Sequence, residues 1–156
     1  TLLLANEMLD AVGIKPKVSP EEALKNGMAM DVWRKMISAQ GGDNDAPLPV
    51  AKETMEIKAT ATGKLLTLDA MKVGVAAWRL GAGRQKQGEV LQLGSGIEIH
   101  AKPGDLVTKD QTILTLHTDE VARFERAIDA LSGGFSIGGK DDEVKRLPLV
   151  VERIEG

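Results

Sequence analysis

Apolar residues in the first forty positions recur with the period of an α-helix. One wide stripe over residues 1–12 is formed by Leu2, Leu3, Leu4, Met8, Leu9 and Val12. A second helix is predicted to begin after Ser19, because this N-cap residue forms a capping box with Glu22 and is followed by Pro20, which suits a first turn. The N-terminal part of the chain, residues 1–40, is therefore predicted to be helical.

The apolar row of this second helix continues at four-residue spacing toward the glycine pair at 41–42. Its members are Leu24, Met28, Val32 and Met36. Gly27 either ends a first helix or is tolerated within a longer one. Trp33 falls on the apolar face and is expected to lie in the core. Residues 41–53 are rich in Gly, Pro, Asp and Asn, a composition typical of a linker.

Beyond the linker the hydrophobic period changes to that of a strand. Alternating apolar residues predict strands at 54–59 and 63–68. Asp69 is a suitable N-cap for a helix over 70–80, and Gly81 stands where a C-terminal glycine ends such a helix. The inward face of this helix is predicted to carry Val73, Ala76, Ala77 and Leu80, with Trp78 also on the apolar side.

The remaining elements are predicted to be short. They are strands at 90–93, 97–101 and 112–117, a helix capped by Thr118 or Asp119 and ending near Leu131, and a last strand at 147–154. Strands and helices do not alternate regularly, which argues against a parallel α/β fold. We predict an α+β fold: a mixed, largely antiparallel sheet domain with two helices over 54–156, after the helical segment 1–40.

Composition excludes several functions. The chain has 156 residues and a formal net charge of −3, so it has no global basic field that would attract nucleic acid or an anionic membrane. The absence of Cys excludes disulfides, thiolate metal sites and a cysteine nucleophile. No apolar run is long enough to span a bilayer. Because the sequence opens within a helical pattern, we expect it to be a piece of a longer protein.

The triplet Ala-Met-Lys at 70–72 is the first candidate for chemistry, because it resembles a biotin attachment site. An attachment lysine lies at the tip of a hairpin, whereas the residues after Lys72 have a helical period and Asp69 precedes the triplet as a cap. A solvated helix lysine is therefore favoured. A carrier domain with Lys72 as its attachment site remains the alternative.

Other candidates carry weaker signals. The sequence Gly-Ala-Gly-Arg at 81–84 could hold an anion, but it follows a helix rather than leading into one, which favours a plain loop. His100 and His117 have no third ligand at a useful spacing, so a metal site is not predicted. The chain shows no nucleophile-base pair and no paired catalytic carboxylates. The residues alone suggest a binding or closure portion rather than a self-sufficient catalyst.

Three motifs nevertheless form one specific combination. The first comprises Gly63, Asp69, Gly74, Ala76, Leu80, Gly81, Gly83 and Arg84. The second comprises Leu93, Gly94, Lys102, Gly104, Asp105, Val107, Asp110, Leu114 and Leu116. The third is "WRKMISAQGGD" at 33–43. Together they resemble the C-terminal part of thymidine and pyrimidine-nucleoside phosphorylases, although Asp110 replaces the usual glycine and Leu93 the usual valine.

This resemblance implies both a fold and a reaction. Residues 54–156 would be the C-terminal domain, of α/β-hammerhead, barrel-sandwich-like form, and residues 1–40 the helical end of a catalytic α/β lobe. The complete enzyme would convert a pyrimidine nucleoside and phosphate to the free base and (deoxy)ribose 1-phosphate. Phosphate is a co-substrate, and no cofactor or metal is implied. Such enzymes are cytoplasmic homodimers, and their catalytic residues lie upstream of Thr1, in N-terminal lobes missing here. The chain alone is therefore expected to be inactive.

One segment of this chain has a role under the resemblance. The residues of the loop at 81–88 resemble those at the mouth of the family's cleft, which settle as the lobes close. Its candidate residues are Gly81, Ala82, Gly83, Arg84, Lys86 and Gly88. A non-catalytic assembly module is a second alternative to the enzyme.

Overall fold

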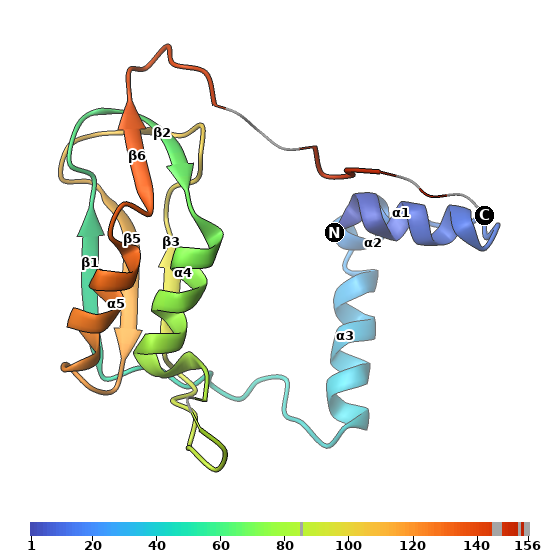
Figure 1. The fold of residues 1–156 in the computed structure, drawn as a ribbon. Coiled ribbons are helices and arrows are strands. Elements are labelled where there is room, and N and C mark those ends of the chain that lie inside the picture. The colour runs from blue at the N-terminus through green and yellow to red at the C-terminus, as the bar shows by residue number, and fades with distance from the viewer. Residues whose placement is uncertain (85, 145–147, 153, 155–156) are drawn as a thin grey trace. The chain divides into compact units, whose positions relative to one another are not determined.

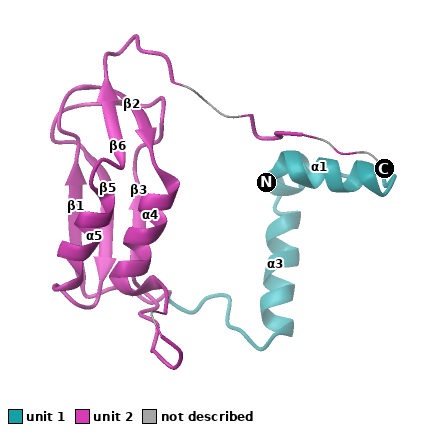
Figure 2. Ribbon diagram, in the orientation of Figure 1, with its two compact units in different colours: residues 1–47 teal, residues 48–156 magenta. Residues whose placement is uncertain are grey.

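The computed structural model describes residues 1–84, 86–144, 148–152 and 154 (Figure 1). The chain divides into two compact units, Thr1–Pro47 and Leu48–Gly156, hereafter unit 1 and unit 2 (Figure 2). The division falls within residues 41–53, where Gly and Pro interrupt the helical pattern.

Unit 1 consists of helices. They are α1 (Leu2–Ala11), α2 (Pro20–Lys25) and α3 (Met28–Ala39). The predicted cap is present, since the Ser19 side chain accepts a hydrogen bond from the Glu22 amide. Gly27 has φ of +88° and separates α2 from α3, which resolves the two predicted alternatives in favour of a break. Asn6 donates a 2.8 Å hydrogen bond to Glu21 and so joins α1 to α2. Backbone hydrogen bonding at Glu21, with help from Asn6, lowers the pKa of its carboxyl group.

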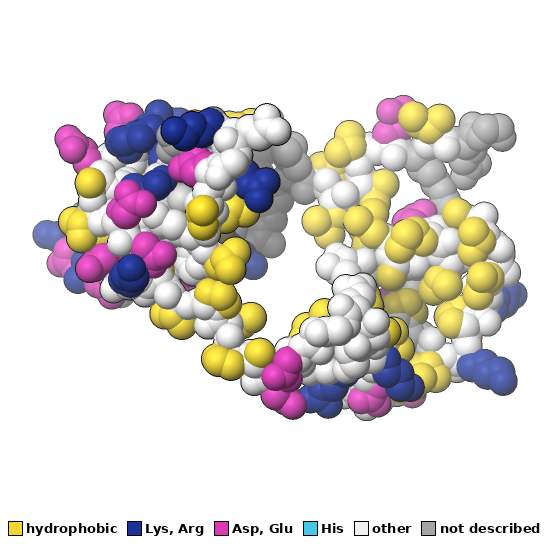
Figure 3. All heavy atoms as spheres, turned by 90° about the horizontal axis from the view of Figure 1, so that it is seen from below, with side chains coloured by type: hydrophobic (Ala, Val, Ile, Leu, Met, Phe, Trp, Pro, Cys, Tyr) yellow, Lys and Arg dark blue, Asp and Glu magenta, His cyan; other side chains and the backbone are white. Residues whose placement is uncertain are grey.

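The three helices of unit 1 bury no residue. Hydrophobic side chains therefore gather on its surface (Figure 3). They include Leu4, Met8, Leu24, Met28, Val32 and Met36. The prediction that Trp33 lies in a core is wrong, because its side chain is 46% exposed. Residues 1–47 form no strand, so these short helices have no sheet within unit 1 against which to pack.

Unit 2 is built on two three-stranded antiparallel sheets. Their strands are β1 (Glu53–Lys58), β2 (Gly63–Leu68), β3 (Gly96–Ile99), β4 (Leu106–Val107), β5 (Thr112–Thr118) and β6 (Phe135–Gly138). The strand orders are β1-β5-β3 and β4-β2-β6, and every pairing is antiparallel. The predicted α+β class and the antiparallel pairing are confirmed.

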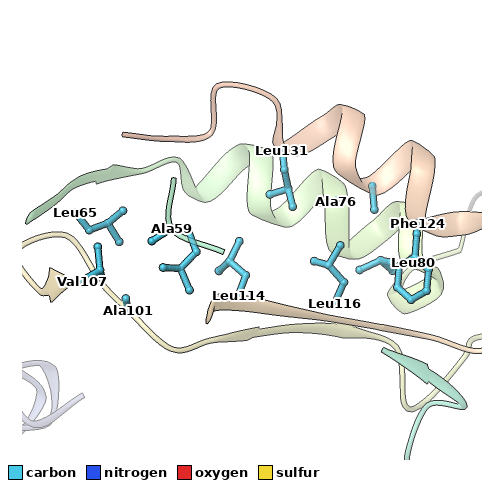
Figure 4. Close-up of a cluster of buried hydrophobic side chains, with 12 residues drawn as sticks. Ala59, Leu65, Ala76, Leu80, Ala101, Val107, Leu114, Leu116, Phe124 and Leu131 are labelled. Carbon is cyan, nitrogen blue, oxygen red and sulfur yellow. The ribbon is translucent and has the colours of Figure 1, made fainter. Parts of the chain in front are cut away.

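Two helices cover one face of the first sheet. They are α4 (Ala70–Ala77), which continues as a π-helical turn, η1 (Trp78–Ala82), and α5 (Arg123–Leu131). Asp69 caps α4 as predicted, because its side chain accepts a 3.0 Å hydrogen bond from the Lys72 amide. Buried side chains fill the space between helices and strands (Figure 4). The core comprises Ala59, Leu65, Ala76, Leu80, Ala101, Val107, Ile113, Leu114, Leu116, Phe124, Ala127 and Leu131.

Several predicted boundaries need correction. Residues 90–93 form no strand. The last helix begins at Arg123 rather than after Thr118 or Asp119, because Thr118 ends β5 and its hydroxyl donates to the Leu80 carbonyl. Within 147–154, residues 148–152 and 154 are not in a strand, while 147 and 153 lie outside the described residues. Strand β6 was not predicted.

The departure at Asp110 has a structural consequence. Its φ is +67°, the left-handed conformation for which glycine is favoured. Asp tolerates this conformation better than most residues. The substitution therefore keeps the turn between β4 and β5, in which the Asp110 amide donates to the Ala59 carbonyl.

Candidate functional site

The loop that follows α4 projects from the end of unit 2 where η1 lies (Figure 1). It begins at Gly81, whose φ of +114° turns the chain out of the helix. A Cβ at Gly81 would lie 2.9 Å from the Gln92 side chain, and one at Gly83 would lie 2.6 Å from Trp78 Cδ1. These two predicted site residues are therefore glycines because side chains from outside the loop press against its backbone.

Trp78 lies against the start of the loop rather than in the core. Its side chain is 39% exposed, so the prediction of a core tryptophan is wrong. The indole Nε1 donates a 3.0 Å hydrogen bond to the Arg84 carbonyl oxygen. The ring thus covers Gly83 and holds the backbone of Arg84, which fixes the direction in which the loop leaves the helix.

The charged side chains of the loop are open to solvent. Arg84 and Lys86 are exposed, as are Ala82 and Gly88. Neither cation forms an ion pair within the described part of the chain. Gln85, between them, lies outside the described residues. Because these two cations form no ion pair with described residues, they can bind an anion without first breaking one.

The histidines lie together on the first sheet. Glu98 on β3 approaches His117 at 3.8 Å and His100 at 3.9 Å, and His100 Nε2 also lies 2.8 Å from Thr115 Oγ1. An open hollow of about 430 Å³ adjoins Glu98 and His117. Among the described residues no group of three or more His, Cys, Asp or Glu could hold a metal ion.

Lys72 has a structural partner. It lies in the first turn of α4, as predicted, and not at a hairpin tip. Its ammonium group, however, is not simply solvated: Nζ donates a 2.5 Å hydrogen bond to the carbonyl oxygen of Ser132, the C-cap residue of α5. A cation at a helix C-terminus complements the carbonyl dipoles there. Lys72 therefore joins the start of α4 to the end of α5.

Sequence reasoning missed Gln92, which contacts the start of the loop and several groups near the end of β5. Its backbone amide donates to the Gly81 carbonyl at 3.3 Å. Its side-chain oxygen accepts from the Asp119 amide at 2.9 Å. Nothing in the spacing around Gln92 marks it, since the partners lie 11 and 27 positions away.

Residues 65–138 match the family model described as the pyrimidine nucleoside phosphorylase C-terminal domain. This part of the chain belongs to that family. The match runs from within β2 to the end of β6 and includes the loop. Within the described residues no helix is long and apolar enough to cross a membrane.

Individual relatives extend the similarity beyond the matched domain. The chain is 44% identical over 154 residues to a thymidine phosphorylase of Mycobacterium tuberculosis, covering 99% of this chain and 35% of the relative. It is 42% identical over 103 residues to a pyrimidine-nucleoside phosphorylase of Staphylococcus epidermidis and 34% identical over 104 residues to one of Geobacillus stearothermophilus. It spans between a quarter and about a third of the curated relatives it matches. Neither these relatives nor the position of Lys72 supports a carrier domain.

Proposed function

We propose that this chain is the C-terminal portion of a pyrimidine-nucleoside phosphorylase of the thymidine phosphorylase type. The observation that carries the proposal is the 44% identity to a thymidine phosphorylase, which extends over 99% of the chain and so includes unit 1 as well as the matched domain. The exposed apolar faces of α1 and α3 fit a segment that packs against N-terminal lobes in the complete enzyme.

In the proposed reaction a phosphate oxygen forms a bond to the anomeric carbon of the nucleoside. The bond from that carbon to the base nitrogen breaks, and the base leaves with the electron pair and takes up a proton. The products are the free base and a pentose 1-phosphate. Rate enhancement would come from holding both substrates together and from fixed charges around them. Phosphate is the second substrate of the proposed reaction, and the proposal includes no cofactor.

The proposed contribution of this chain is the loop containing Gly81, Gly83, Arg84, Lys86 and Gly88. Its cations are exposed and form no ion pair with described residues, while its first residues are held by Trp78 and Gln92. A loop with a fixed base and a free charged tip can close over a cleft that holds phosphate or an acidic side chain of the facing lobe. Closure would exclude water and retain the substrates.

We further propose that the isolated chain is inactive and that the complete protein is an active cytoplasmic homodimer. Among the described residues no group of three or more His, Cys, Asp or Glu could hold a metal ion, and the hydrogen-bonded pair of His100 and Thr115 has no part in the proposed reaction. A non-catalytic assembly module is the competing function, and it predicts that adding the missing lobes restores no turnover.

A chimera tests the proposal directly. The segment of the Mycobacterium tuberculosis thymidine phosphorylase that aligns with this chain is replaced by residues 1–156, and phosphorolysis of thymidine and of uridine is followed by release of the free base. We expect turnover by the chimera, and only background turnover by the isolated chain and by the relative without its aligned segment. A folded chimera that fails to turn over either nucleoside would contradict the proposal.

A further inference from the structure

Gln92, where the loop returns, contacts Gly81, where the loop begins, through both its backbone and its side chain. Its amide donates to the carbonyl of Gly81, and its side chain occupies the space that a Cβ on Gly81 would need, 2.9 Å away. The segment 82–91, which extends the candidate loop 81–88 as far as Gln92, thus begins and ends at the contacting pair Gly81 and Gln92. The conformation of Gly81 and the position of Gln92 depend on each other.

The carboxamide of Gln92 is fully engaged outside the loop. Its Oε1 accepts hydrogen bonds from the Asp119 amide at 2.9 Å and the Ser95 hydroxyl at 2.8 Å, and its Nε2 donates to the Glu120 carboxylate. The Thr118 hydroxyl lies 3.1 Å from the same Oε1 and donates its single proton to the Leu80 carbonyl at 2.8 Å. Thr118 is completely buried, so this network is anchored at one point in the core, at the end of β5.

A second connection reaches the loop through Arg123. The Arg123 guanidinium lies 3.1 Å from the Glu120 carboxylate and 3.7 Å from the Glu89 carboxylate, which belongs to the returning half of the loop. The Arg123 side chain is 19% exposed, so these pairs are partly shielded from water. Glu120 in the turn before α5 thus contacts Gln92, and Arg123 at the start of α5 contacts Glu89.

We propose that Gln92 is a positioning residue, which holds the two ends of the loop 82–91 on the β5–α5 turn so that Arg84 and Lys86 project in one arrangement. The inference rests on the proposed function of the loop for its effect on catalysis. The positioning itself stands on the contacts of Gln92. Arg84 has its own backbone restraint from Trp78, so loss of Gln92 would release the returning half of the loop more than the leaving half.

The first experiment measures loop release without any activity. Gln92→Ala in the 156-residue chain removes the carboxamide, and trypsin cleavage after Arg84 and Lys86 is timed by mass spectrometry. Cleavage reports the population of the opened loop. We expect cleavage after Lys86 to be about tenfold faster, since several hydrogen bonds are lost together, and cleavage after Arg84 to accelerate less, because Trp78 still holds that backbone.

Gln111→Ala is the matched control. Gln111 also uses its Oε1 to accept a backbone amide, that of Thr108 at 2.9 Å. It precedes the opposite end of β5, roughly 23 Å from Thr118 at about 3.3 Å per residue. Equal cleavage after Arg84 and Lys86 in the two variants would overturn the inference. If Gln92→Ala unfolds the chain, Gln92→Glu keeps an acceptor oxygen but places a carboxylate where the amide donated to Glu120, so a hydrogen bond is replaced by repulsion between like charges. It is then expected to accelerate cleavage measurably, and the absence of any acceleration would also overturn the inference.

The second experiment links positioning to catalysis in the chimera. Gln92→Ala should lower kcat/KM by about tenfold when Arg84 is present and by clearly less when Arg84→Ala is already present, because part of the effect of Gln92 acts through the Arg84 side chain. An equal loss in both backgrounds would overturn the inference that Gln92 acts through the loop cation. Faster cleavage with unchanged kcat/KM would support the positioning and would contradict the role of the loop in the proposed function.

Discussion

Units 1 and 2 contain helices with equally clear start signals and very different surroundings. Ser19 caps α2 and Asp69 caps α4, each through a hydrogen bond to a backbone amide three positions on. The helices of unit 1 bury no residue, whereas α4 and α5 bury Ala76 and three residues of α5 against the first sheet. A helical period therefore predicts a helix but not what covers its apolar face.

The difference bears on function. A helix in isolation gains little stability in water, and most of its stability in proteins comes from packing of the apolar face. Within unit 1 the faces of α1 and α3 are uncovered, so in our account they pack against the lobes of a complete phosphorylase. Unit 2 has its own core and needs no such cover to hold the loop in place.

The largest expected difference between the units is in the cost of removing one leucine. Leu116 is completely buried between β5 and the helices, and Leu116→Ala should lower the free energy of unfolding by about 2–5 kcal/mol. Leu4 is 60% exposed on α1, and Leu4→Ala should change the free energy of unfolding by less than about 0.5 kcal/mol. Urea unfolding followed by circular dichroism compares the two. Similar losses would mean that the apolar surface of unit 1 is buried in the isolated chain.

A smaller effect is expected at the contact between α4 and α5. Lys72→Met removes the hydrogen bond to the Ser132 carbonyl and should destabilise unit 2 by about 0.5–1.5 kcal/mol. Lys102→Met is the matched control, because the Lys102 side chain is exposed and forms no ion pair with described residues. Thermal unfolding of both variants decides the matter. Identical melting temperatures would mean that Lys72 contributes no more to stability than a solvated surface lysine.

Signals within a few residues of each other correctly predicted the elements that depend only on neighbouring residues. The alternation at 54–59, the cap at Asp69 and the glycine at 81 each correspond to an observed feature: β1, the start of α4 and the turn out of η1. Each depends on residues a few positions apart. The glycines of the loop were also predicted, through the motif that contains Arg84.

Features set by distant contacts were not predicted. Residues 90–93 were predicted to form a strand but do not, because the Gln92 amide bonds to Gly81 and its carboxamide bonds to Asp119 and neighbouring groups instead of to a strand. The helix expected from Thr118 starts later because that hydroxyl is needed by the Leu80 carbonyl. Trp78 satisfies a helical apolar pattern, yet its ring lies against a loop backbone six positions on. Only three-dimensional packing reveals these partners.

The central claim, that the loop of unit 2 serves catalysis, is tested most directly by Arg84→Ala in the chimera. Steady-state kinetics with thymidine and a melting curve are measured on the same variant. We predict that kcat/KM falls by roughly 10- to 100-fold, which corresponds to the loss of about one or two charge-assisted hydrogen bonds. The melting temperature should barely change, because an exposed loop arginine contributes little to folding. Unchanged kinetics would contradict the account and leave the loop a purely structural connection between η1 and β3.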